Sequence, residues 1–169
     1  KMGQRARLAM TLKKLSKKPN DPQIRRDVID LYKQAVAQHE DRINSYKAST
    51  DMGRYDAMIA EYNTLQQINE SIRTSAVFRE VETRNYTMQL QEVRNEAAEA
   101  YYQSGLRNLD YGTKRDARRA YSDFQRVKRY VSSYKDVDRM MRVAYEASIV
   151  NVLVNPIQSG FPGMWNNNN

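Results

Sequence analysis

The sequence has 169 residues, a formal net charge of +8 at pH 7 and no cysteine. The lack of cysteine excludes disulfides, zinc–thiolate sites and cysteine nucleophiles. Only 6 glycines and 4 prolines are present, and so few helix breakers predict a mostly helical chain. No apolar run reaches the roughly 18 residues of a membrane span. The first residue is Lys1, with no initiator methionine and no signal peptide, so we expect a piece of a longer chain.

The positive charge is concentrated at one end of the sequence. Residues 1–26 contain nine Lys or Arg and a single acid, Asp21. The other 19 basic residues are balanced by 19 acidic ones. The excess therefore belongs to the N-terminal helix and its surroundings, not to the surface as a whole.

Apolar residues that recur every three or four positions predict six helices in succession. Pro19 ends the first helix, and Pro22 suits the first position of the second. Residues 49–53 are predicted to form a turn. Residues 73–85 are predicted to form a partly irregular linker that Phe78 pins in place. Asn85 can then cap the fourth helix. The six helices are expected over about residues 2–15, 22–47, 55–72, 86–109, 115–131 and 137–148.

The region 97–137 predicts a helical hairpin with close packing between its two helices. Gly112 supplies the turn, because a residue without a Cβ can reverse the chain without strain. Gly105 and Ala117 are small, and we expect them to face each other across the hairpin so that the backbones approach closely. Tyr101 and Tyr121 would fill the flanks.

These residues resemble a tetratricopeptide unit. Gly105, Gly112, Ala117 and Tyr121 stand where such a unit has its small residue, turn glycine, packing alanine and aromatic, while Phe124 replaces the second small residue. Glycine–alanine pairs at 3/6, 53/57 and 112/117 suggest three units, 51 and then 60 residues apart. A standard unit spans roughly 34 residues, so longer helices or longer links are expected.

The sequence changes character after Ser148. Val150, Val152 and Val154 alternate with other residues before Pro156, which is the pattern of a strand. A single strand cannot satisfy its own backbone groups, so we expect it to begin a β domain beyond this chain, with strand addition to a partner protein as the alternative. The predicted organisation is an all-α domain of antiparallel helical hairpins stacked as a short tetratricopeptide-like solenoid over residues 1–148, a strand-like segment over 149–157 and an irregular tail over 158–169.

The combination of AEAYYQSG with DARRAYSDFQRV, then YKDVDRMM and IVNVLVNPI, resembles envelope lipoproteins of Bacteroidetes-type bacteria. Their tetratricopeptide-like helices are followed by a β region. This resemblance implies a periplasmic or outer-membrane-associated protein that binds other proteins within an envelope complex. It also implies an N-terminal lipid on a cysteine, which these residues lack.

The sequence offers little that predicts catalysis. His39 is the single histidine and falls in line with apolar residues of its helix, so we expect a satisfied, half-buried imidazole. The carboxylate pairs lie in charged contexts where solvated surface or capping is the ordinary interpretation. Phosphate loops, nucleophile elbows and metal-binding helices are absent from the sequence. We therefore predict a non-enzymatic protein with no catalytic, metal or cofactor-binding residues.

The predicted function is a scaffold or adaptor that binds other proteins, with no small-molecule substrate. Tyrosine and arginine are favoured at binding surfaces, and the C-terminal valines could pair with a partner. The candidate partner-binding residues are Arg118, Arg119, Arg126, Arg129, Tyr101, Tyr121, Val150, Val152 and Val154.

The basic N-terminal helix leaves two alternatives open. It could bind nucleic acid, although the charge is confined to 26 residues and no known motif accompanies it. It could instead lie on an anionic membrane surface, although it lacks the interfacial Trp or Phe of such helices.

Overall fold

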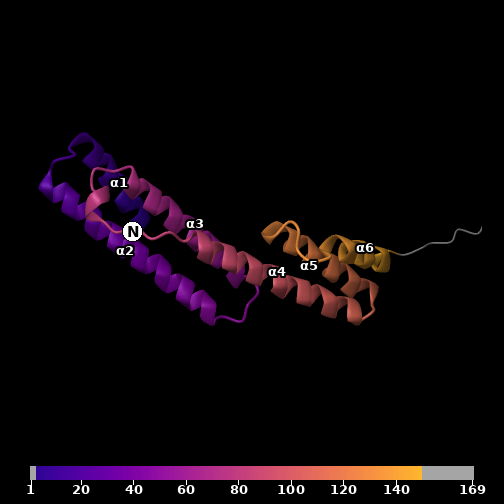
Figure 1. Cartoon of the computed structure of the whole chain (residues 1–169). Helices are drawn as coiled ribbons and strands as arrows, with labels where there is room; N and C mark the ends of the chain where they lie inside the picture. Colours follow the sequence, from indigo (N-terminus) through magenta and orange to yellow (C-terminus); the bar gives the residue numbers. More distant parts are fainter. Residues whose placement is uncertain (1–2, 150–169) are drawn as a thin grey trace, which may run out of the picture.

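The computed structural model describes residues 3–149, and these form an all-α protein, as predicted (Figure 1). The helices are α1 (Gln4–Lys17), α2 (Pro22–Ala48), α3 (Arg54–Arg73), the short 3-10 turn η1 (Phe78–Glu80), α4 (Thr87–Asp110), α5 (Lys114–Tyr130) and α6 (Val137–Ser148). All six predicted helices are present with bounds within about three residues of the expected ones. None of the helices in residues 3–149 is both long enough and apolar enough to cross a bilayer.

Local signals explain where several helices begin. Asp21 accepts hydrogen bonds from the backbone N–H groups of Gln23 and Ile24, at 2.9 and 3.1 Å, and Pro22 is the first residue of α2. The Thr113 side chain caps α5 by accepting from the N–H of Asp116. Asn85 accepts from the N–H of Thr87, the first residue of α4, at 2.9 Å, but the N-cap residue is Tyr86 and not Asn85 as expected.

The helices pack in chain order, each against the next (Figure 1). A first core joins α1, the start of α2, the end of α3 and the linker that follows α3. A second core joins the start of α3 to α4, α5 and α6. Because α4 contacts α3 along its first half and α5 along its second, it connects the two ends of an elongated molecule.

The linker between α3 and α4 is irregular, as predicted, but Phe78 does not pin it. Val77 and Val81 are buried in the first core, whereas Phe78 is 42% exposed. Asn69 also holds this linker: its amide donates to the carbonyl of Arg84 and accepts from the hydroxyl of Tyr32 at 2.9 Å. The polar contacts and the two valines fix the segment and leave the phenyl ring in solvent.

The glycine–alanine pairs do not mark equivalent positions. Gly112 has φ +70 and needs the freedom of glycine, but Gly3 and Gly53 have φ of −68 and −63, which any residue adopts. Ala6 is exposed, so it does not pack as a tetratricopeptide alanine would. The long helices account for the wide spacing: α2, α3 and α4 have 27, 20 and 24 residues.

The predicted contact between Gly105 and Ala117 is wrong. The atoms nearest to a Cβ built on Gly105 all belong to the ring of Phe124. Ala117 is buried nearer the turn. The close approach of α4 and α5 is real, but it accommodates an aromatic ring and not a second small residue.

The helical pattern ends where the sequence indicated. The backbone of Ile149, immediately after α6, is extended, with φ −80 and ψ 152. The remainder of the predicted strand, including Val150, Val152 and Val154, and the predicted tail lie outside the described residues.

Candidate functional site

The candidate surface is built on α5, a strongly amphipathic helix. Its buried row faces α4 and α6, while seven basic side chains emerge from its other sides. The row consists of Ala117, Ala120, Phe124 and Val127. The basic residues are Lys114, Arg115, Arg118, Arg119, Arg126, Lys128 and Arg129.

Two of the predicted partner-binding residues, the buried Tyr101 and the partly buried Arg126, contact each other. Tyr101 is only 2% exposed and stacks on Tyr130, with ring centroids 5.7 Å apart. Arg126 donates to the Tyr101 hydroxyl at 2.6 Å, and its guanidinium carbon lies 5.0 Å from the centroid of that ring. These contacts tie α5 to α4, so both side chains are already occupied.

The same tyrosine pair connects the end of α5 to α3. The Tyr130 hydroxyl donates to Asp56 at 2.7 Å. Partial burial and this hydrogen bond raise the pKa of Tyr130 above its usual range. The phenol therefore stays protonated and keeps its donor role at physiological pH.

The other three arginines remain at the surface. Arg119 pairs with Asp116 at 3.1 Å, three residues earlier on α5. Arg118 and Arg129 are exposed on the side of the helix opposite the buried row, and neither forms an ion pair with any residue between 3 and 149. A solvated charged side is the ordinary result for such a helix, so these two arginines alone do not define a binding site.

An open groove between α5 and α6 is the more distinctive feature. It encloses about 700 Å³ and is lined by Tyr121, Asp138, Met141, Arg142, Tyr145 and Glu146. The rings of Tyr121 and Tyr145 have centroids 6.1 Å apart. Tyr145 is 56% exposed, so an aromatic surface remains in contact with water in this groove.

One wall of this groove is held in position by an ion pair. Lys128 of α5 bonds Asp138 of α6 at 2.6 Å. Arg142 forms no ion pair within the described part of the chain. The groove thus combines two tyrosines and a methionine with one cation that is not paired with a carboxylate among residues 3–149.

The sequence pointed to Tyr121 but not to Met141, Arg142 or Tyr145. Met141 and Tyr145 are four positions apart on α6, next to the buried positions Met140 and Ala144. This widening of the apolar stripe was visible in the sequence. The sequence could not show that this side of α6 is exposed. A helix with neighbouring helices on both sides has an apolar stripe of the same width.

The remaining polar groups show how the carboxylates are used. Asp123 accepts from Ser104 and Asn108, both at 2.8 Å, and Asp136 accepts from the Tyr102 hydroxyl. His39 is buried and contacts Glu61 through Nδ1, as expected for a satisfied imidazole. Residues 3–149 contain no group of three or more His, Cys, Asp or Glu that could hold a metal ion.

No family model matches the chain, and no curated protein or solved structure gives a match.

Proposed function

We propose that this protein is a non-enzymatic helical scaffold that binds a partner protein in the groove between α5 and α6. The observation that carries the proposal is the exposed aromatic surface of Tyr121 and Tyr145 beside Met141. Tyrosine, methionine and arginine are enriched at protein interfaces. In α6 the large apolar side chains of Val143 and Tyr145 are also exposed, at 40% and 56%.

The groove suits an apolar side chain presented by a partner, with an acidic or carbonyl group close by. The two tyrosine rings supply rigid apolar area at low entropic cost. Arg142 supplies donors for an acceptor on the partner. Asp138 and Glu146 border the same groove, and they would repel a partner that is acidic throughout.

The proposal is tested by affinity capture with matched variants. Tyr145→Ala together with Tyr121→Ala should abolish capture of the partner that the wild-type protein retains, because both removed rings line the groove. Tyr111→Ala and Met88→Ala remove apolar side chains elsewhere that are more exposed than Tyr145, and both variants should retain it. If the groove variant and the control variant capture the same proteins, the groove is not the binding site.

A second measurement separates a partner from a second copy of the chain. Sedimentation of the wild-type protein should show a monomer over the concentrations used for capture. Self-association that Tyr121→Ala abolishes would assign the groove to a homodimer and would contradict the proposal.

We also propose a location in the bacterial cell envelope. Its support is the sequence resemblance to envelope lipoproteins with helical repeats. Fractionation of cells that express the complete gene product is the test, and recovery in the cytoplasmic fraction would overturn it.

A further inference from the structure

We propose that the end of the molecule opposite the groove binds an anionic lipid surface. We call this end the basic tip and define it as Lys13, Lys14, Lys17, Lys18, Arg26, Phe78 and Arg79. These residues come from the end of α1, the start of α2 and the turn η1. The proposal concerns a different surface from the α5–α6 groove, so either can fail without the other.

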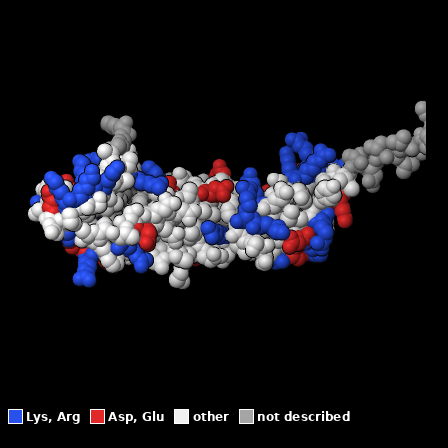
Figure 2. Space-filling view, turned by 90° about the horizontal axis from the view of Figure 1, so that it is seen from above, with Lys and Arg blue, Asp and Glu red and all other residues white. Residues whose placement is uncertain are grey.

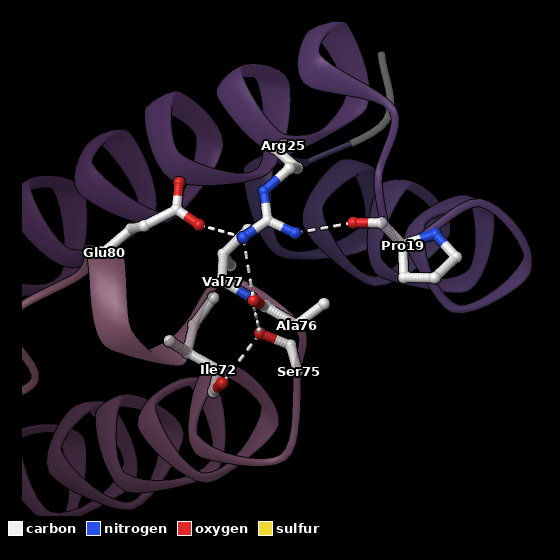
Figure 3. A network of polar contacts seen from close by, with 7 residues as sticks. All are labelled: Pro19, Arg25, Ile72, Ser75, Ala76, Val77 and Glu80. Atoms are coloured by element: carbon white, nitrogen blue, oxygen red, sulfur yellow. Dashed lines mark hydrogen bonds and ion pairs between the residues drawn. The ribbon is translucent and has the colours of Figure 1, made fainter.

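The tip is assembled by one arginine that joins all three segments (Figure 3). Arg25 in the first turn of α2 donates to the carbonyl of Pro19, after α1, and at 3.0 Å to the carbonyl of Ala76, before η1. It also pairs with Glu80. Residues 51 and 55 positions apart in the sequence are thereby held at one end of the protein.

The cations of the tip are not paired with acidic residues in the described part of the chain, although Lys14 lines one hollow with Asp27 and Asp30. All six are exposed, and none forms an ion pair with a residue between 3 and 149. Figure 2 shows Lys and Arg side chains gathered toward both ends of the molecule, with largely uncharged side chains between them. Repulsion among neighbouring cations favours an anionic partner here.

Helix electrostatics explain only part of this charge. Lys14 and Lys17 lie in the last turn of α1, where cations complement the helix dipole. Arg26 lies near the start of α2, where a cation opposes the dipole, and its one hydrogen bond is to Gln23 at 3.0 Å. Its position therefore contributes nothing evident to folding.

Phe78 is the observation that selects a lipid surface. Its ring is 42% exposed beside Arg79, although Val77 and Val81 on either side are buried. An exposed aromatic at a basic end of a protein is what an interfacial site needs, since the ring enters the headgroup region while the cations meet phosphates. The sequence pattern of α1 alone lacks this aromatic, and only the fold brings it to the same end as the lysines.

The geometry also says how the protein would bind. The leucine stripe of α1 is used inside the protein, with Leu8 and Leu15 buried, so α1 cannot insert into the bilayer as a free amphipathic helix does. The protein then binds the lipid surface through electrostatic attraction of the basic tip, with Phe78 as the one aromatic anchor. A single-stranded nucleic acid would instead need a groove with several stacking rings.

Vesicle co-sedimentation with the full chain tests the proposal. Vesicles that contain phosphatidylserine should bind the protein, vesicles of phosphatidylcholine alone should not, and raised salt should weaken binding. Lys17→Gln with Lys18→Gln should lower the partition coefficient about 25-fold, from about fivefold for each charge. Lys114→Gln with Arg115→Gln removes the same charge at the other end and should change it less than about twofold.

The aromatic anchor is tested separately. Phe78→Ala should weaken vesicle binding about fivefold at every salt concentration, because the ring acts through apolar contact. Tyr111→Ala, which removes an exposed ring from the turn after α4, should have no effect. Circular dichroism melting checks that each variant is folded.

Three results would overturn the proposal. The first is equal binding to neutral and anionic vesicles, and the second is equal losses for the two charge variants. The third is binding to duplex DNA that Lys17→Gln with Lys18→Gln weakens and Phe78→Ala leaves unchanged, which would assign the tip to nucleic acid.

Discussion

The ring of Phe124 occupies the space that a Cβ on Gly105 would need. A Cβ built there lies 2.6 Å from Cε1 and 2.7 Å from Cζ of the ring. Both residues are buried, and Phe124 has no exposed surface. At this point α4 and α5 pack one aromatic ring directly against a glycine, with no room for a larger side chain.

We predict that Gly105→Ala destabilises the protein by about 1–3 kcal/mol, because the added methyl group forces the ring or the helices to move. Better helix propensity offsets part of this cost, by at most about 1 kcal/mol. Urea denaturation followed by circular dichroism measures the change. Combining Gly105→Ala with Phe124→Leu should cost less than the sum of the two single changes. Additive effects would show that the ring does not press on this position.

Gly112 should respond to substitution for a different reason. Its φ of +70 lies in the left-handed region, and nothing lies within 4 Å of a Cβ built there. Gly112→Ala should therefore cost about 1 kcal/mol through backbone strain alone. Gly112→Asn should cost less than the alanine change, since asparagine tolerates this conformation. The melting temperatures of the two variants test this prediction. A lower melting temperature for the asparagine variant than for the alanine variant would contradict the strain argument.

The sequence was sufficient to predict the helices but not the contacts between them. A 3.6-residue period identifies the buried face of each helix, and in α4 the buried residues Leu90, Val93 and Ala97 follow this period. It does not say which residues of two faces meet, because this depends on the distance and angle between helices. The expected contact of Gly105 with Ala117 failed for that reason.

The surface features depended on the same missing information. Phe78 was expected to anchor the linker because it is the largest apolar residue there, yet the smaller Val77 fits the first core and has no exposed surface. Tyr101 was assigned to a surface, but α5 covers it. Conversely, Tyr145 lies next to the buried Ala144 on α6 and is exposed. Whether a side chain is exposed depends on which helix packs beside it. The apolar pattern of a single helix does not carry that information.

Asn69 offers a test of the polar contacts that hold the linker. It is buried, accepts from the Tyr32 hydroxyl at 2.9 Å and donates to the carbonyl of Arg84. Asn69→Leu should lower the free energy of unfolding by about 1–3 kcal/mol, because both partners lose a hydrogen bond away from bulk water. Tyr32→Phe removes only one of these bonds and should cost less. A larger cost for the tyrosine change would contradict this account, and urea denaturation measures both.

The last prediction concerns acid stability and rests on Glu99 in α4. Hydrogen bonds from Lys135, Tyr134 and Gln103 lower the pKa of Glu99 from its usual 4.5 to about 2. Lys135 and Tyr134 belong to the turn between α5 and α6, so this carboxylate ties that turn to α4.

The folded protein binds the Glu99 proton less tightly than the unfolded chain does. Its stabilising contribution is therefore fully present above pH 4.5 and is lost as the pH falls to about 2. Since 42% of the side chain is exposed, solvent screens the interaction and its contribution stays below about 1 kcal/mol. Urea midpoints of the wild type and of Glu99→Gln should differ at pH 6 and converge as the pH approaches 2. Glu92→Gln, an exposed glutamate of the same helix without an ion pair in residues 3–149, is the matched control. A constant difference between the wild type and Glu99→Gln over this pH range would show that the carboxylate charge does not hold the turn.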